Sequence, residues 1–215
     1  TNTNTNTNDT TQTDDEQKKD MQVLKNTVSQ AIEDVSNAEE EEIKANQSML
    51  VKSIDRVEDF IKFGLGRLFG NDEKVSQQDL QDIAYEVSKK LENKVQITFR
   101  QQADNITSQK ASGIEDVVTN DEGVGIKPQT IREDVKQVEQ TFVTQLKDEI
   151  DEAATKIKTD MLKTAQEIET QVVNEKFAQR GKHVTVVNGT LVKDQDQDNN
   201  NDLEKDKEPE PEPEP

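Results

Sequence analysis

The sequence avoids helix-breaking residues over long stretches. Its first glycine is Gly64, its first proline is Pro128 and its next proline is Pro209. Proline removes a helical hydrogen bond and glycine costs conformational entropy, so a chain that avoids both can form very long helices. We therefore predict three long helices, at about residues 14–68, 76–118 and 131–178.

Capping and stop signals place the ends of these helices. A capping box is a Ser or Thr followed three residues later by an acidic or amide residue. Such patterns occur at Thr13–Glu16, Ser76–Asp79 and Thr130–Glu133. The predicted stops are the glycines between Gly64 and Gly70, a turn at 120–123, and Gly181. A further cap signal at Ser36–Glu39 offers, as an alternative, a break inside the first helix.

Apolar residues recur with a period of eleven inside the predicted helices, as Ile43, Ile54 and Leu65 illustrate. Eleven residues in three turns give about 3.67 residues per turn, close to a relaxed helix, so such helices pack side by side with little supercoiling. We predict that this stripe is the interaction seam of the protein. Its central residues are Val35, Ile43, Ile54, Val57, Leu91, Leu146, Ile150, Ile157 and Ile168.

The predicted fold class is all-α, an elongated antiparallel three-helix bundle or coiled coil over residues 14–180. Because the stripe is narrow, each helix has to bury it against a partner. The short connection at 70–75 favours a hairpin of the first two helices. The alternative is a partly open helix that finds its partner in another copy of the chain.

Residues 181–193 change to a period of two and predict a β-hairpin. Val184–Val187 and Thr190–Val192 flank the pair Asn188–Gly189, which suits a type I′ turn. A single two-stranded hairpin is not stable alone and needs a surface to lie on. We favour packing on its own bundle over donation to another chain.

The two ends have compositions that predict disorder. Residues 1–13 are an Asn- and Thr-rich leader with no apolar side chain to bury. Residues 194–215 form an acidic tail that ends in Glu-Pro repeats, which favour an extended spacer. The whole chain has 46 acidic and 27 basic residues, a formal net charge of −19.

The sequence offers little support for catalysis. It contains no cysteine and one histidine, His183, which excludes a thiol nucleophile and a Cys-based zinc site. Neither a phosphate-binding loop nor a nucleophile-elbow motif is present. Carboxylates are abundant, but nothing in the sequence indicates a pair in an apolar cleft that would shift its pKa. We expect a non-enzymatic protein with no cofactor and no small-molecule substrate.

Nucleic acid and metal are also weak candidates as partners. The strongly acidic chain has no cluster of basic residues of the kind that binds nucleic acid. Asp194, Asp196, Asp198 and Asp202 have a spacing similar to that of a calcium-binding loop. Lys205 occupies the place of the closing bidentate carboxylate, so we treat calcium only as an alternative to a solvated acidic tail.

The apolar face widens between Met49 and Phe69. This segment is predicted to be the thickest part of the bundle core, and the alternative is a surface that lies on lipid or another apolar phase. The eleven-residue period is similar to that of apolipoproteins, perilipins, synucleins and granule-coating phasins. That resemblance implies contact with an apolar surface, which would use Phe60, Phe63, Leu65, Leu68 and Phe69.

Taken together, these features predict a helical structural or interaction protein: a scaffold, spacer or tether. Its expected partners are proteins, including other copies of itself. The alternative function is a coat on an apolar surface through residues 49–69, although membrane contact is not favoured for so acidic a chain. A calcium-responsive binding module is a weaker alternative. The sequence does not indicate a cellular compartment.

Overall fold

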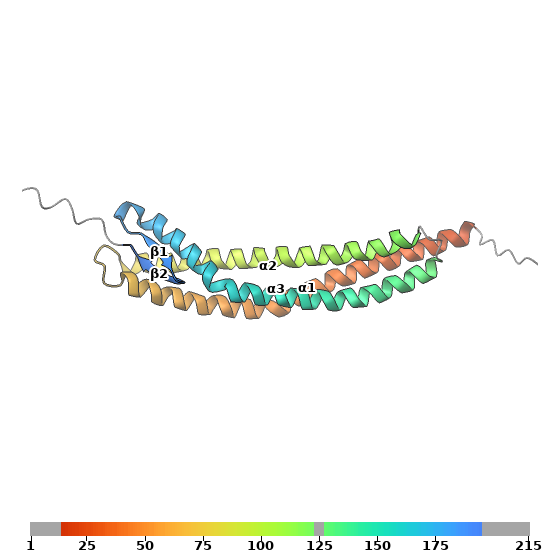
Figure 1. Cartoon of the computed structure of the whole chain (residues 1–215), viewed down its shortest axis with the longest axis horizontal. Helices are drawn as coiled ribbons and strands as arrows, with labels where there is room; N and C mark the ends of the chain where they lie inside the picture. The colour runs from red at the N-terminus through yellow and green to blue at the C-terminus, as the bar shows by residue number, and fades with distance from the viewer. Residues whose placement is uncertain (1–13, 123–126, 195–215) are drawn as a thin grey trace, which may run out of the picture. The chain divides into compact units, whose positions relative to one another are not determined.

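The computed structural model describes residues 14–122 and 127–194. Figure 1 shows three long helices followed by a small antiparallel sheet, and this confirms the predicted all-α fold with a C-terminal hairpin. The elements are α1 (Asp14–Phe69), α2 (Gln77–Glu122), α3 (Pro128–Phe177), the 3₁₀ turn η1 (Ala178–Arg180), β1 (Val184–Val187) and β2 (Thr190–Lys193). The predicted leader and all but the first residue of the predicted tail lie outside the described residues.

The chain divides into two compact units, and parts of all three helices contribute to each of them. Among the described residues, unit 1 consists of 14–48, 97–122 and 127–156. Unit 2 consists of 49–96 and 157–194 and therefore includes the hairpin.

The start of α2 confirms the predicted capping box. The Ser76 hydroxyl accepts a hydrogen bond from the backbone N–H of Asp79 at 3.1 Å, and the Asp79 carboxylate accepts one from the N–H of Ser76 at 3.0 Å. Val75 and Leu80 flank the box and are both buried. This reciprocal cap with flanking apolar contacts fixes the direction in which the chain enters α2.

Two of the other predicted boundaries need correction, and the break offered as an alternative inside the first helix is not seen. Helix α3 begins at Pro128 rather than near Thr130, because the Lys127 carbonyl already accepts hydrogen bonds from the N–H groups of Thr130 and Ile131. Proline is favoured at a first helical position, where its missing N–H would have no partner. Helix α2 continues to Glu122, past the predicted end at 118, and α1 runs through 36–37 without a break.

The hairpin has the turn that its sequence predicts. Asn188 and Gly189 have φ angles of 52° and 74°, as a type I′ turn requires, and Val187 pairs with Thr190 across it. Gly181, with φ of 68°, ends the 3₁₀ turn in the left-handed conformation expected of a helix stop.

The hairpin lies on the helices of its own unit, as we favoured. The Asn174 side chain in α3 makes two hydrogen bonds with the backbone of Val184. Its amide oxygen accepts from the Val184 N–H at 2.8 Å, and its amide nitrogen donates to the Val184 carbonyl at 3.1 Å. On the other strand, the Lys193 ammonium lies 5.8 Å from the centre of the Phe69 ring. The two strands are therefore held by α3 and by the end of α1.

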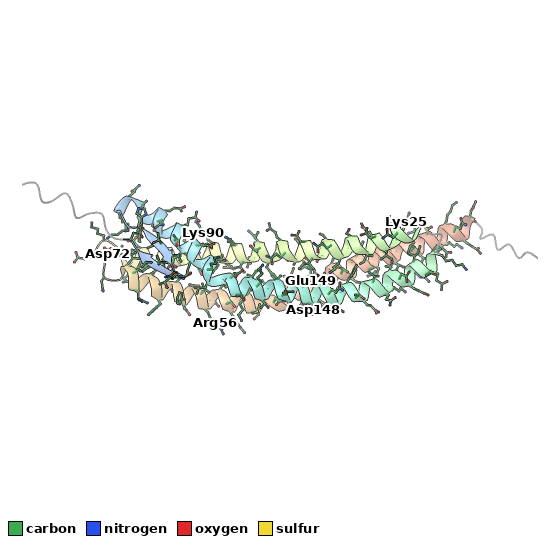
Figure 2. All side chains as sticks on the ribbon, in the orientation of Figure 1. Lys25, Arg56, Asp72, Lys90, Asp148 and Glu149 are labelled. Atoms are coloured by element: carbon green, nitrogen blue, oxygen red, sulfur yellow. The ribbon has the colours of Figure 1, made fainter. Side chains whose placement is uncertain are left out.

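The apolar stripe of each helix lies inside its unit. None of the stripe positions is exposed. The edge-to-face pair Phe69–Phe177, with ring centres 5.4 Å apart, closes the core of unit 2. Charged side chains such as Lys25 and Asp148 in unit 1 and Arg56 and Lys90 in unit 2 project away from the ribbon (Figure 2). Of the predicted seam residues, Val57 and Ile157 are half-buried, and the buried ones are Val35, Ile43, Ile54, Leu91, Leu146, Ile150 and Ile168.

The burial of Ile150 generates a stability prediction. Ile150 is fully buried in unit 1, so Ile150→Ala should lower the free energy of unfolding by about 2–5 kcal/mol in urea denaturation followed by circular dichroism. Ile97 is a matched control in the same unit, because it is 58% exposed. Ile97→Ala should change the stability by no more than about 0.5 kcal/mol. Equal losses in the two variants would contradict the assignment of the core.

Candidate interaction surface

Exposed apolar side chains of the described residues are concentrated in unit 2. In unit 1 they are Met21, Val23 and Ile97. In unit 2 they are Val51, Phe60, Phe63, Tyr85, Leu162, Val186, Val187 and Val192. Scattered exposed apolar residues are ordinary, whereas neighbouring ones are typical of a contact surface, and Phe60 and Phe63 are neighbours three residues apart on α1. Unit 2 is therefore the better candidate for a functional site.

The segment predicted to contact an apolar surface is divided between the core and the outside. Phe60 and Phe63 are 54% and 65% exposed, whereas Leu65 and Phe69 are fully buried and Leu68 is half-buried. The helical repeat explains this division, since Leu65 and Phe69 are one turn apart on the inward face. In the folded chain Leu65 and Phe69 therefore belong to the core, the interpretation that we favoured for this segment, and of the residues named for the alternative Phe60 and Phe63 are the exposed ones.

A cavity of about 160 Å³ lies beside the two exposed phenylalanines. Helix α1 lines it with Phe60, Phe63 and Arg67, and α3 lines it with Gln166 and Glu169. The hairpin turn covers part of it, and the Gln166 amide holds that turn by donating a hydrogen bond to the Gly189 carbonyl at 2.7 Å. The cavity therefore has one apolar wall and one wall that carries polar groups.

Glu169 is the unusual residue of this cavity. It is only 4% exposed, and burial raises the pKa of its carboxyl group to about 7. Within the part of the chain that the structure describes, it makes no hydrogen bond and no ion pair. Burying a carboxylate without a partner is unfavourable, so this group is poised to take up a proton or a cation.

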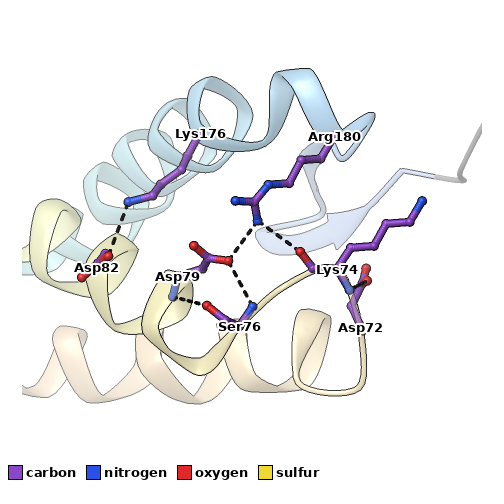
Figure 3. A network of polar contacts seen from close by, with 7 residues as sticks. All are labelled: Asp72, Lys74, Ser76, Asp79, Asp82, Lys176 and Arg180. Atoms are coloured by element: carbon purple, nitrogen blue, oxygen red, sulfur yellow. Dashed lines mark hydrogen bonds and ion pairs between the residues drawn. The ribbon is translucent and has the colours of Figure 1, made fainter.

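A polar network holds the hairpin end of unit 2 in place (Figure 3). Arg180 donates to the Lys74 carbonyl at 3.1 Å and to the Asp79 carboxylate at 2.9 Å, which lowers the pKa of Asp79 to about 2. Lys182 is buried and lies 2.9 Å from Asp72. The turn between α1 and α2 is thereby tied to the segment that leads into the hairpin, and this fixes the hairpin over the cavity.

Unit 1 contains a feature that sequence reasoning missed. Three pairs of carboxylates face one another between helices and share hydrogen bonds: Asp34–Glu139, Glu39–Asp104 and Glu42–Asp151. Burial and the neighbouring carboxylate raise the pKa of Glu39 and of Glu139 to about 7. The hydrogen bond with Asp151, together with burial, raises the pKa of Glu42 to about 6. The sequence alone gave no indication of these pairs.

These pairs are better explained by packing than by catalysis. Two carboxylates in contact cannot both ionise easily, so one of them retains a proton and donates it to the other. Catalytic dyads use the same chemistry, but a dyad belongs to one cleft. Here the arrangement occurs at three places along the facing helices of unit 1. We interpret it as a property of the helix–helix contact.

The remaining candidate residues add no site. Of the predicted calcium ligands, only Asp194 is described, and its carboxylate accepts a hydrogen bond from the Thr185 hydroxyl at 3.0 Å. Asp196, Asp198 and Asp202 lie outside the described residues. Among residues 14–122 and 127–194 no group of three potential ligands could hold a metal ion. His183 is exposed at the start of the hairpin.

Comparisons with known proteins do not add to this description. The chain matches no protein-family model, no curated protein and no solved structure. Within the described residues, none of the helices carries an apolar stretch that could cross a membrane.

The carboxylate pairs of unit 1 generate a pH prediction. The pKa of Glu139 is about 7 in the folded chain against 4.5 for an ordinary glutamate, so its stabilising contribution is complete below pH 4.5 and is lost as pH rises through 7. The free energy of unfolding should therefore fall between about pH 5 and about pH 8 in urea denaturation. Glu139→Gln cannot titrate and should make that fall shallower.

Glu133 is the control for this experiment, because it is an exposed glutamate near the start of the same helix. Glu133→Gln should keep the pH dependence of the parent chain. An unchanged pH dependence in Glu139→Gln would contradict the assignment of a shared proton to the Asp34–Glu139 pair.

Proposed function

We propose that this protein is a non-enzymatic helical scaffold, spacer or tether that works through contacts with other proteins, including copies of itself. The observation that supports this proposal most is the concentration of exposed apolar side chains in unit 2. Long helices can hold binding groups at a distance from one another. Exposed aromatic residues can supply much of the binding free energy with a partner.

The burial of the stripe bears on how such contacts would form. Seam residues such as Leu91 and Leu146 are fully buried within the single chain. They are not available to a partner unless the helices open. Self-association of the folded protein would therefore use the outer surface, and Phe60 and Phe63 are the largest apolar groups of unit 2 that point outward on α1.

Self-association is tested by the mass of the protein in solution. We expect multi-angle light scattering to give a mass that rises with concentration above that of a single chain. The double variant Phe60→Ser, Phe63→Ser should remain a single chain, because the largest exposed apolar groups of α1 have been removed. Ile97→Ser is the control, since Ile97 is similarly exposed but belongs to unit 1.

Two results would contradict self-association through this surface. The parent chain could have the mass of one chain at every concentration. Alternatively, the double variant could associate as strongly as the parent.

A second function, coating of an apolar surface, is favoured by the exposure of Phe60 and Phe63 within the predicted segment 49–69. The inward residues Leu65 and Phe69 would join such a contact only if unit 2 opened. Opening in the presence of neutral lipid vesicles would change the near-ultraviolet dichroism of the aromatic residues. Dichroism that does not respond to vesicles would remove this alternative.

A further inference from the structure

We propose that the cavity beside Glu169 binds a primary ammonium group carried on a short aliphatic chain. This inference goes beyond the scaffold function, because it assigns a ligand chemistry to a specific site in unit 2. It rests on three observations: a buried carboxylate without a partner, an apolar wall opposite to it, and a cavity of limited size.

The polar side of the cavity favours a cation at a pH at which Glu169 is ionised. Glu169 lines the cavity, is 4% exposed and makes no hydrogen bond or ion pair within the described part of the chain. An anionic ligand would face this carboxylate and be repelled. A cation would supply the missing partner, and hydrogen bonds between ionised groups are stronger than neutral ones.

The other walls suit a hydrocarbon chain. Phe60, Phe63 and Leu68 come from α1, and Leu191 comes from the hairpin. Methylene groups would pack on these side chains, and the faces of the two aromatic rings attract a nearby positive charge. The volume of about 160 Å³ is close to the roughly 150 Å³ of an engineered cavity that holds benzene, so a ligand of about that size fits.

An ammonium group fits better than a guanidinium group. A guanidinium presents five donors in a rigid fork, whereas an ammonium is a compact charge with three donors. Besides Glu169, the cavity lining contains no second acidic side chain, and its one other charged residue, Arg67, is itself a donor. A guanidinium would leave more of its donors without partners, which is unfavourable in a partly buried site.

The ammonium could come from a free alkylamine or from a lysine side chain of another protein. Both sources have the same recognised group, and two probes distinguish them. One probe is n-butylammonium chloride. The other is a capped Gly-Lys-Gly peptide, with the acetyl-lysine peptide as its neutral counterpart.

Binding is measured by titrating each probe into the full chain at about pH 8, where Glu169 is mostly ionised, and recording methyl resonances by NMR. We expect saturable shifts at the Leu68 and Leu191 methyl groups. Glu169→Gln should weaken butylammonium binding by about tenfold or more, because it removes the charged acceptor. The neutral probe 1-pentanol should not distinguish the variant from the parent.

Glu167 provides a matched control, because it is an exposed carboxylate on the same helix. Glu167→Gln should leave the affinity for butylammonium unchanged, and circular dichroism should show that both variants remain folded. Tighter binding of the lysine peptide than of butylammonium identifies a protein as the source of the group. The reverse order identifies a free amine.

Three results would overturn the proposal. The parent chain could show no saturable shift with either charged probe. Glu169→Gln could bind butylammonium as tightly as the parent. Binding could also appear only after Arg67→Gln, which would mean that Arg67 itself occupies the carboxylate in solution. Phe60 and Phe63 also belong to the surface proposed for self-association, so the titrations are carried out at concentrations at which light scattering gives the mass of one chain. Under that condition a failure of the ligand site does not count against self-association.

Discussion

Burial of a narrow apolar stripe on each helix is the interaction on which the rest of the structure depends. The helices are 56, 46 and 50 residues long, and most of their surface is polar or charged. Such helices gain most of their stability from packing rather than from their own propensity. In each unit the stripes of the three helices supply the core. Because the stripe of α1 faces inward, Phe60 and Phe63 lie on the exposed side of that helix.

Carboxylates placed in or beside this packing face give the protein its unusual electrostatics. Glu39 and Glu169 are buried, and Glu139 faces Asp34 of another helix. All three have a pKa of about 7, chiefly because burial penalises the charged form. In unit 1 a second carboxylate shares the proton. In unit 2 Glu169 has an open cavity beside it instead, and the same physical penalty there becomes a reason to bind a cation.

Local signals in the sequence predicted much of the fold. The capping box at Ser76, the turn at Asn188–Gly189 and the avoidance of glycine and proline each depend on a few neighbouring residues. The start of α3 was misplaced because Pro128 begins a helix more effectively than Thr130 caps one. The cavity and the carboxylate pairs could not be predicted, because they depend on how residues far apart in sequence are aligned across helices. Asp34 and Glu139 are an example.

Cysteine labelling tests the burial of the stripe most directly, because the chain has no native cysteine. Single cysteine substitutions along α1 would be labelled with a thiol reagent in the folded protein. We expect slow labelling at Leu50, Ile54 and Ile61 and rapid labelling at Phe60 and Phe63. The pattern of low labelling rates along α1 should repeat every eleven residues. Labelling at similar rates along the whole helix would contradict it.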